Sequence, residues 1–349
     1  MTIVDLGVPS LGPADPAPAS GPLVDTFGRI ATDLRVSLTD RCNLRCTYCM
    51  PADGLDWLPG DQLLAPAELI RLLRIAVTRL GITSVRFTGG EPLVAKNLDD
   101  IIAATAALRP RAEITLTTNG IGLARRATKL KDAGLDRINV SLDTVDAARF
   151  SRITRRDRLG DVLEGLAAAK AAGLNPVKVN AVLDPETGLD DAVQLLRFCI
   201  DHGYQLRIIE QMPLDADHQW QRGRAVSADD ILAELRRHFD LTPNTEARGS
   251  APAELWRVDG DRGLVGIIAS VSHAFCSACD RTRLTADGQV RNCLFARQET
   301  DLRHLMRTGA DDDGLAAAWR AAMWAKAAGH GINDPGFVQP DRPMSAIGG

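Results

Sequence analysis

Apolar residues recur along this chain with two periods, and the two periods alternate over much of its length. Short runs of apolar and β-branched residues predict strands, while longer runs with apolar residues three and four positions apart predict helices. The predicted strands are Leu34–Leu38, Ser84–Phe87, Glu113–Thr117, Arg137–Ser141, Val177–Val182 and Leu206–Glu210. The predicted helices are Ala67–Leu80, Leu98–Leu108, Leu123–Ala133, Asp161–Ala172 and Asp190–His202.

Glycines at the ends of the helical stretches support these boundaries. A glycine after the last apolar position suits a left-handed helix cap. Four helices are followed by one, at Gly81, Gly134, Gly173 and Gly203. Six consecutive strand–helix units predict a parallel sheet. Because six units are too few for a closed eight-stranded barrel, we expect an open α/β fold, a partial (β/α)6 barrel of the TIM type.

The pattern changes on either side of this region. Residues 1–30 are rich in Pro, Ala and Gly and are expected to be a disordered leader. The barrel is expected over residues 31–215, and residues 216–349 are expected to form a C-terminal α+β extension. Its expected elements are a helix at Ala228–Phe239, strands at Leu255–Val258 and Leu264–Ala269, a hairpin turn at Asp287–Gly288, and helices at Leu302–Arg307 and Leu315–Ala328.

Composition narrows the class of protein. The chain has 349 residues, 45% of them apolar, which is enough for a large core, and its net charge is −4. That charge gives no overall attraction to nucleic acid or to an anionic membrane, and no apolar run approaches the length of a membrane span. Six of the seven cysteines fall in two compact trios, unlike a secreted disulfide framework. We therefore expect a cytoplasmic protein that binds neither nucleic acid nor membrane.

The first trio is Cys42, Cys46 and Cys49, in the pattern C-x3-C-x2-C. Three thiolates leave one iron of a four-iron cluster without a protein ligand, and an open coordination position is typical of a catalytic metal site. A zinc site is the alternative, but zinc needs a fourth ligand and no histidine lies nearby. Tyr48, just before the last cysteine, could pack against a ligand. The spacing therefore favours a catalytic iron–sulfur cluster.

Polar residues follow several predicted strands. Gly89 and Gly90, in the segment TGGEP, come after the second strand, where paired glycines let a ligand approach the backbone. An ordinary turn is the alternative. Thr117–Asn119, Ser141–Asp143 and Gln211–Met212 also lie at the carboxyl ends of strands, where barrel active sites form. Each could be a simple turn or cap, but together they occupy one rim of the sheet.

The second trio is Cys276, Cys279 and Cys293, in the pattern C-x2-C-x13-C. His273 could complete a structural zinc site with these cysteines, so spacing alone leaves zinc and a second cluster open. The remaining cysteine, Cys199, falls within a predicted helix and is expected in the core. Arg281 and Arg283 alternate beside the trio in CSACDRTRL, on one face of an expected strand. Paired guanidinium groups suit phosphate or carboxylate binding, whereas a solvated edge is the alternative.

These segments together resemble a known family. The C-x3-C-x2-C motif with an aromatic residue before its last cysteine resembles the radical S-adenosylmethionine (SAM) superfamily. The second trio, the R-x-R pair and the Gly-Gly end resemble, within it, the GTP 3′,8-cyclase family, which begins molybdenum-cofactor biosynthesis. The matching segments are LRVSLTDRCNLRCTYCMP, VRFTGGEPL, TTNG, INVSLD, VKVNAV, IEQM, CSACDRTRL, NCLF and the terminal GG.

The resemblance implies two [4Fe-4S] clusters, one on each trio, with SAM at the first and GTP at the second. It implies a set of SAM contacts, which are Tyr48, Gly90, Ser141 and Met212. It implies a set of GTP contacts, which are Arg35, Arg86, Thr117, Lys178, Arg281, Thr282 and Arg283. Its catalytic residues would be Cys42, Cys46, Cys49, Arg281, Arg283, Gly348 and Gly349. The sequence has no P-loop, so side-chain cations must hold the triphosphate.

The implied reaction is radical cyclisation of GTP by a lyase. A 5′-deoxyadenosyl radical takes hydrogen from ribose C3′, and C3′ then joins C8 of guanine, giving (8S)-3′,8-cyclo-7,8-dihydroguanosine 5′-triphosphate. The implied partners are a flavodoxin- or ferredoxin-like one-electron donor and the downstream cyclic pyranopterin monophosphate synthase, with a homodimer left open. Lys96 is a weaker phosphate candidate. The rival interpretations are a peptide-modifying radical SAM enzyme and a zinc-stabilised binding protein.

Overall fold

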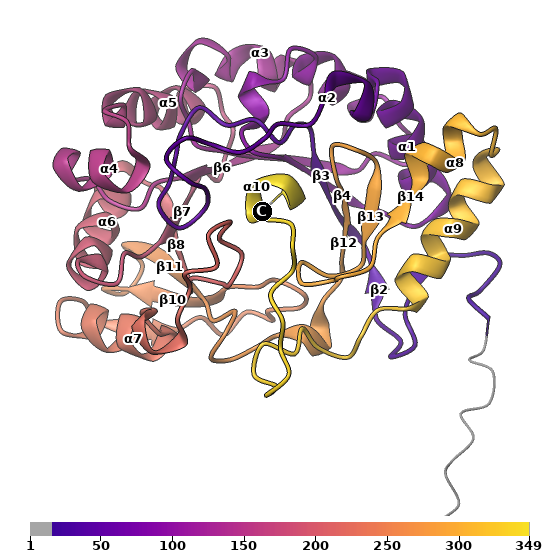
Figure 1. The fold of residues 1–349 in the computed structure, drawn as a ribbon. Coiled ribbons are helices and arrows are strands. Elements are labelled where there is room, and N and C mark those ends of the chain that lie inside the picture. Colours follow the sequence, from indigo (N-terminus) through magenta and orange to yellow (C-terminus); the bar gives the residue numbers. More distant parts are fainter. Residues whose placement is uncertain (1–15, 349) are drawn as a thin grey trace, which may run out of the picture.

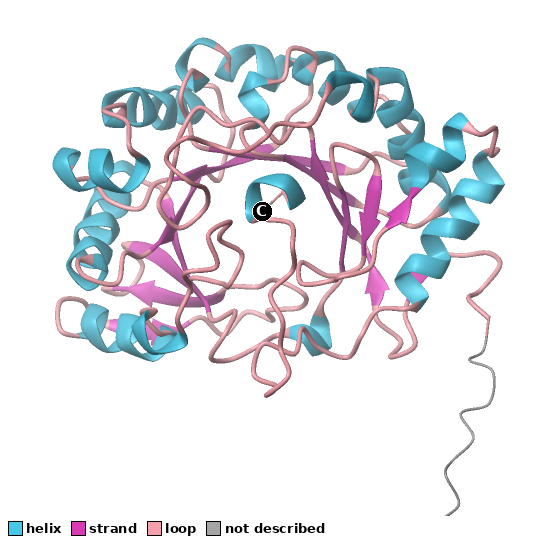
Figure 2. Cartoon of the chain, in the orientation of Figure 1, coloured by secondary structure: helices cyan, strands magenta, loops and turns pink. Residues whose placement is uncertain are grey.

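Six strand–helix units occur where the sequence pattern predicts them. The computed structural model describes residues 16–348, and its strands form a curved sheet with helices along the outer side (Figures 1 and 2). The strands are β3 (Asp33–Ser37), β4 (Ser84–Thr88), β5 (Glu113–Thr118), β6 (Arg137–Ser141), β7 (Lys178–Val182) and β8 (Gln205–Ile209). The helices between them are α1 (Pro66–Arg79), α2 (Leu98–Ala106), α3 (Ala127–Asp132), α4 (Ala147–Thr154), α5 (Leu159–Ala171) and α6 (Gly188–His202).

Local details agree with the helix-end signals, with two differences. The four predicted capping glycines all have positive φ angles: Gly81 77°, Gly134 107°, Gly173 73° and Gly203 69°. The predicted helix at residues 123–133 is divided into a 3-10 turn, Leu123–Arg125, and α3. Helix α4 was not predicted; the Asp146 carboxylate caps it by accepting the Arg149 N–H at 2.8 Å.

The parallel sheet is wider than six strands. Strand β11 (Gly263–Ile268) pairs in parallel with β8, and β12 (Arg281–Leu284) pairs in parallel with β3, so eight adjacent strands run in one direction. Antiparallel strands continue the two edges: β9 (Leu241–Pro243), β10 (Glu254–Val258), β13 (Gln289–Arg291) and β14 (Thr300–Asp301). The C-terminal region thus extends both edges of the barrel sheet, and the barrel remains open between β11 and β12.

Part of the expected leader is ordered. Strands β1 (Leu23–Val24) and β2 (Ile30–Ala31) form a short antiparallel pair, and the Leu23 side chain is fully buried. The apolar side chain of Leu23 is the physical reason, since it has a place in the core against α9. The expectation of disorder does not agree with this pair of strands, while residues 1–15 lie outside the described residues.

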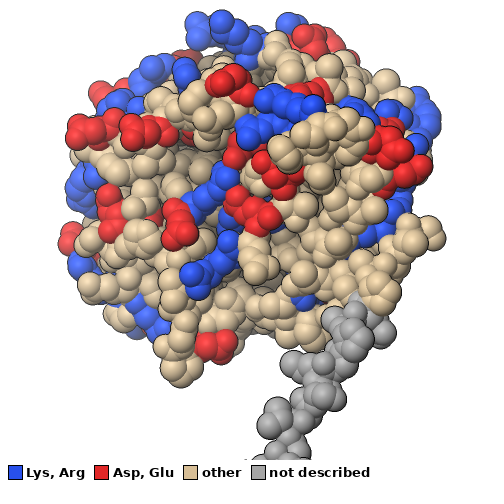
Figure 3. Space-filling model, turned by 45° about the vertical axis from the view of Figure 1, so that its right-hand side comes forward, with Lys and Arg blue, Asp and Glu red and all other residues tan. Residues whose placement is uncertain are grey.

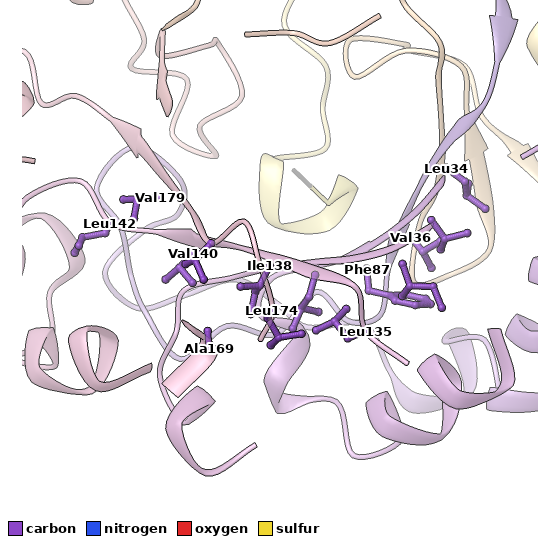
Figure 4. Packing of buried hydrophobic residues seen from close by; sticks show 14 of the residues in the cluster. Leu34, Val36, Phe87, Leu135, Ile138, Val140, Leu142, Ala169, Leu174 and Val179 are labelled. Carbon is purple, nitrogen blue, oxygen red and sulfur yellow. The ribbon is translucent and has the colours of Figure 1, made fainter. Parts of the chain in front are cut away.

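Strand alternation separates an apolar outer face from a polar inner face. Leu34, Val36 and Phe87 are fully buried and pack between the sheet and the helices, as do Ile138 and Val140 (Figure 4). The residues between them in sequence point to the inner side of the sheet. The core therefore lies outside the barrel sheet, which leaves the inner face available for polar chemistry.

The remaining helices are α7 (Ala228–Arg236), α8 (Leu302–Arg307), α9 (Asp312–Trp324) and α10 (Met344–Ile347). Helix α10 lies within the curve of the sheet, and α8 and α9 lie beside its β14 edge (Figure 1). On the face drawn in Figure 3, acidic and basic side chains are interspersed. Within residues 16–348, no helix has both the length and the apolar character to cross a membrane.

Candidate active site

A cavity of about 320 Å³ lies on the inner side of the sheet. That volume falls in the range of small-molecule sites, about 300–1,000 Å³. Many residues that the sequence singled out line its wall: Arg35, Tyr48, Arg86, Thr117, Ser141, Met212, Cys276, Cys279, Arg281, Arg283 and Cys293. The fold therefore joins most of the expected SAM and GTP contacts to the second cysteine trio in one chamber.

A row of cations crosses the cavity floor. Arg283 on β12 stands opposite Arg35 on β3, which stands opposite Arg86 on β4. Like charges directly opposite one another on a sheet are destabilising. Asp33 is the carboxylate beside this row, with its Oδ2 3.8 Å from Nε of both Arg35 and Arg281. The cations therefore outnumber the carboxylate, and an anionic ligand would relieve the repulsion.

The pKa values of these groups reflect burial among other cations. Burial, followed by the charge of Arg35, lowers the pKa of Arg86 to about 9. Burial also lowers the pKa of Arg207 to about 10, and that of Lys178 to about 7, where Arg207 adds to the effect. Within residues 16–348, Nε of Arg35, Arg86 and Arg207 lacks a hydrogen-bond partner. Phosphate oxygens would supply both the missing acceptors and the missing negative charge.

The first trio lies on a tight loop next to this cavity rather than in its wall. The Cys49 N–H donates to the Cys46 carbonyl at 2.9 Å, and the Asn119 amide donates to the Cys42 sulfur at 3.8 Å. Burial raises the pKa of all three thiols, that of Cys49 to about 12. Buried thiols without a metal favour the neutral form, and bound metal reverses this preference.

Tyr48 connects the first loop to the cavity wall. Its hydroxyl donates to Oδ2 of Asp143 at 2.7 Å, while Oδ1 of Asp143 accepts the Val182 N–H at 2.9 Å. Burial raises the pKa of Asp143 to about 6. This hydrogen bond ties the cysteine loop to the carboxyl end of β6, where Ser141 also faces the cavity.

The paired glycines after β4 are required by close packing against the same loop. A Cβ at Gly90 would lie 2.3 Å from the Asp40 carbonyl oxygen, and one at Gly89 would lie 2.4 Å from that of Thr39. The Gly90 N–H donates to the Thr39 carbonyl at 2.7 Å. Glu91 follows with its carboxylate buried. Gly90 thus packs against the main chain just before Cys42 and lies outside the cavity wall, and its expected SAM contact remains a prediction.

All three cysteines of the second trio line the cavity. Cys276 begins a 3-10 turn, Cys276–Ala278, and the Cys279 N–H donates back to the Cys276 carbonyl at 3.2 Å. Cys293 comes from the loop after β13. Burial raises the pKa of Cys276, whereas at Cys279 burial is outweighed by the charges of Lys326 and Arg281, so that its pKa is lowered.

His273 lies away from the second trio. Its side chain is largely exposed, and Nε2 is 3.4 Å from Asp229. In the part of the chain from residue 16 to 348, no group of three or more His, Cys, Asp or Glu side chains, the two cysteine trios included, is arranged as for a single metal ion. His330 lines the cavity instead, with Nε2 next to the Ser270 carbonyl and Nδ1 accepting the Ile332 N–H. The geometry does not favour the zinc alternative built on His273.

The C-terminal segment, described as far as Gly348, reaches the inner face of the sheet. Arg283 Nη1 donates to the Gly348 carbonyl, and Gly348 packs so closely that a Cβ would lie 2.9 Å from Thr88. Ser345 on α10 lies near Cys49 and lowers the pKa of this thiol, against the larger effect of burial. Gly349 lies outside the described residues. The tail therefore lies between the cation row and the first trio.

Thr282 is the clearest departure from the expected site. Its hydroxyl is fully buried on the opposite face of β12 and accepts the indole N–H of Trp319 at 3.1 Å. Alternation along β12 is the reason, because Arg281 and Arg283 face the cavity and the residue between them cannot. Lys178 is on the inner face of β7 but outside the cavity wall. Lys96 is exposed, as a solvated lysine would be, and Cys199 is buried in the core.

Several cavity residues were missed from the sequence as site residues, three of them polar residues on strands of the parallel sheet. Asp33, Asn180 and Arg207 all line the wall. A polar residue between apolar neighbours in a strand was the available signal, and it had already singled out Arg35, Arg86 and Lys178. Asn180 follows Lys178 by two positions in VKVNAV, so the same alternation places it on the inner face.

Comparisons with known proteins decide the family. The model of the radical SAM superfamily matches residues 36–199, and that of Molybdenum Cofactor Synthesis C matches residues 204–332. A GTP 3′,8-cyclase of Mycobacterium sp. (strain KMS) is 78% identical over 350 residues and is covered fully, as is this chain. This chain belongs to the GTP 3′,8-cyclase family.

Further relatives agree with this assignment. The GTP 3′,8-cyclase of Mycolicibacterium smegmatis is 74% identical over 361 residues, and GTP 3′,8-cyclase 2 of Mycobacterium tuberculosis (strain H37Rv) is 71% identical over 360 residues, each with full coverage of both chains. Among solved structures, Streptococcus suis SuiB bound to S-adenosylmethionine aligns with a TM-score of 0.56 at 13% identity, covering 90% of this chain and 74% of that one. That likeness concerns the fold alone.

Proposed function

We propose that this protein is a GTP 3′,8-cyclase of the lyase class, which converts GTP to (8S)-3′,8-cyclo-7,8-dihydroguanosine 5′-triphosphate as the first step of molybdenum-cofactor biosynthesis. The observation that carries the proposal is the single cavity, which unites the Tyr48 side of the first trio, a row of arginines and the second trio. The full-length relatives named GTP 3′,8-cyclase support it.

Each cysteine trio would hold one [4Fe-4S] cluster. Thiolate sulfur is the donor these clusters use, and both trios also have an N–H donor beside a sulfur, from Asn119 at Cys42 and from Lys326 at Cys279. The chemistry supplied by the first cluster with SAM is a 5′-deoxyadenosyl radical. SAM would be held by Tyr48, Gly90, Ser141 and Met212. The Asp143 carboxylate accepts a hydrogen bond from the Tyr48 hydroxyl and would keep that side chain in place.

GTP would lie across the cation row. Arg35 and Arg86 would bind the triphosphate together with Lys178, each supplying charge and hydrogen-bond donors. Arg281 and Arg283 beside the second trio would orient the nucleoside, and Thr117 would contact it from β5. Positioning the ribose near SAM and excluding water are the protein's contribution, since reacting groups held in place react far faster than free ones. The Gly348–Gly349 tail would complete this chamber.

The partners are part of the proposal. A flavodoxin- or ferredoxin-like protein would deliver the single electron, and the product would pass to a cyclic pyranopterin monophosphate synthase. We place the enzyme in the cytoplasm, where thiols stay reduced. Whether it forms a homodimer follows from sedimentation of the reconstituted protein.

Anaerobic turnover tests the proposal. Reconstituted protein is incubated with SAM, dithionite and GTP, and 5′-deoxyadenosine and a cyclised guanosine triphosphate are measured by chromatography and mass spectrometry. Iron and sulfide analysis should give about eight irons per chain for two cubes. Radical formation from SAM without any change in GTP would contradict the proposal, and so would zinc in place of iron.

A further inference from the structure

A lysine buried behind the second trio has an unusual set of neighbours. Lys326 follows α9 and is 4% exposed, and its Nζ donates to the Arg281 carbonyl at 2.9 Å and to the Cys279 carbonyl at 3.3 Å. The same Nζ is 3.4 Å from the Cys279 sulfur. Across residues 16–348, no Asp or Glu forms an ion pair with this lysine. A buried ammonium without a counter-charge is costly, and the Cys279 thiolate is the available anion.

An arginine from the loop between β1 and β2 reaches the same cysteine turn. Arg29 Nη1 donates to the Cys276 carbonyl and to the Ala328 carbonyl, both at 2.8 Å, and Nη2 donates to the Ala327 carbonyl at 2.6 Å. Asp25, itself fully buried, holds the guanidinium through Nε at 2.5 Å. Five N–H groups in a rigid fork can satisfy several carbonyls at once, which a lysine cannot do.

The two cations meet at one short segment. Lys326, Ala327 and Ala328 are consecutive, and they join the end of α9 to the Cys276–Ala278 turn through the contacts of Lys326 and Arg29. If these cations merely capped α9, they would bind the last carbonyls of that helix. Lys326 Nζ instead binds the carbonyls of Cys279, a proposed metal ligand, and of Arg281, two residues further along the chain. The arrangement thus fixes the main chain on both sides of the C-x2-C turn.

We propose that Lys326 and Arg29 are positioning residues of the second cysteine trio, Lys326 as the counter-charge of the Cys279 sulfur and Arg29 as the brace of the Cys276 main chain. The inference rests on the proposed function only in taking this trio as metal ligands. Groups that hydrogen-bond to metal ligands commonly contribute 10–100-fold to metal affinity, and hydrogen bonds to cluster sulfurs raise the reduction potential. The N-terminal segment that carries Arg29 would therefore support a cysteine turn that lies 247 residues later in the chain.

The test isolates the second trio. A parent variant with Cys42→Ala, Cys46→Ala and Cys49→Ala is reconstituted anaerobically as the full chain, and its iron content, the rate of iron loss to a chelator and the midpoint potential are measured. Lys326→Met in this parent should lose iron about tenfold faster or more, with the potential shifted to more negative values. Lys326→Arg should restore most of both properties. Lys129→Met is the matched control, because that lysine is 73% exposed, and it should behave as the parent.

Arg29 is expected to act through geometry more than charge. Arg29→Gln should also speed iron loss about tenfold, but with a smaller shift in potential than Lys326→Met, because the Arg29 guanidinium donates to main-chain carbonyls rather than to sulfur. Arg29→Lys, which keeps the charge but not the fork, should resemble Arg29→Gln in iron loss. Circular dichroism of each variant separates these effects from unfolding.

The outcomes separate the presence of a second cluster from the roles of Lys326 and Arg29. A parent that takes up no iron while remaining folded would overturn the second cluster, and the inference with it. A parent that holds iron, together with a folded Lys326→Met variant of unchanged iron loss and potential, would overturn the inference alone. Equal potentials for Lys326→Met and the parent with faster iron loss would remove the counter-charge role.

Discussion

The two cysteine trios lie beside one chamber but differ in the charges that act on Cys46 of the first and Cys279 of the second. At the first, burial raises the pKa of every thiol, and the charge acting on Cys46 from Asp143 is negative. At the second, Lys326 and Arg281 act on Cys279 and lower its pKa against the effect of burial. Positive surroundings and hydrogen bonds to sulfur raise the potential of a cluster. We therefore expect the first trio to favour electron donation and the second to favour binding of an anionic substrate.

The largest expected effect separates the trios by the step that each supports. Cys42→Ser should abolish both 5′-deoxyadenosine and the cyclised nucleotide, because the first trio is proposed to support radical formation. Cys276→Ser should keep part of the SAM cleavage and lose the cyclised product, because the second trio is proposed to bind GTP. Both products are measured in one anaerobic assay. Wild-type yield of the cyclic product from Cys276→Ser would refute the role of the second trio.

Deleting Gly348 and Gly349 should come next in size. Arg283 donates to the Gly348 carbonyl at the inner face, so loss of the tail frees a buried guanidinium beside the substrate. Turnover should fall by about 10²-fold or more, as when a positioned group near the reaction is lost. Iron content should be unchanged in both trios. Adding two glycines beyond residue 349 is the control for altered length, and full activity of the deletion would place the tail outside the mechanism.

The cation row is expected to lower the stability of the ligand-free protein and to raise its affinity for GTP. Arg86→Met removes a charge that faces Arg35 across the strands, so GTP affinity should fall by about 10–100-fold, corresponding to the ~1.5–3 kcal/mol typical of hydrogen bonds to charged groups. The free energy of unfolding of the ligand-free protein should rise by about 0.5–1 kcal/mol, since like charges opposite one another destabilise a sheet. Calorimetric titration and denaturant unfolding give the two numbers.

Arg125 provides the control for this substitution, because its side chain is exposed on the outer side of the barrel. Arg125→Met should change neither GTP affinity nor stability measurably. A loss of stability in Arg86→Met would mean that Asp33 and its neighbours already balance the charge of Arg86 in the ligand-free protein.

The pH dependence of GTP binding should be a smaller effect than the loss of affinity in Arg86→Met, and it should depend on Lys178. Its pKa is lowered to about 7, so the free protein loses this charge above that pH, and binding must then take up a proton. The Kd for GTP should rise by up to about tenfold per pH unit above 7. The unfolded chain binds more protons between pH 7 and the ordinary value of 10.5, so the free energy of unfolding should rise with pH there.

Lys178→Met separates this effect from the titration of GTP itself, which both proteins share. The variant should bind GTP more weakly at pH 6.5 and lose the extra pH slope of both Kd and unfolding. Identical slopes in the two proteins would assign the pH dependence to another group.

The sequence predicted the elements better than it predicted their assembly. The six units from Asp33 to Ile209 followed directly from alternating periods, because each unit is local. Strands β11 and β12 were recognised only as segments of an extension, since their partners β8 and β3 are set by contacts distant in sequence. The buried Leu23 in a leader rich in Pro and Gly was missed for the same reason. Local composition does not show that Leu23 packs against α9, which lies almost 300 residues later in the chain.

The site shows the same limit. Cys276, Arg281 and Arg283 were found from their spacing, and the cavity contains all three. Lys326 was not found, because a lysine 47 residues from Cys279 has no signal in sequence that connects the two. Arg207 was missed although its strand has the same alternation as that of Arg35. Spacing therefore identified the candidate metal ligands, while the groups that surround them required the fold.

The smallest expected effect at the site concerns Thr282, and it tests how strictly alternation divides β12. Thr282→Val keeps the shape but leaves the buried indole N–H of Trp319 without an acceptor, so the free energy of unfolding should fall by about 1–2 kcal/mol. GTP affinity should change less than twofold, because the hydroxyl faces away from the cavity. Thr117→Val, on the cavity wall, should do the reverse and weaken GTP binding with little change in stability. A tenfold loss of GTP affinity in Thr282→Val at unchanged stability would indicate that the Thr282 hydroxyl contacts GTP, and would mean that β12 rotates when GTP binds.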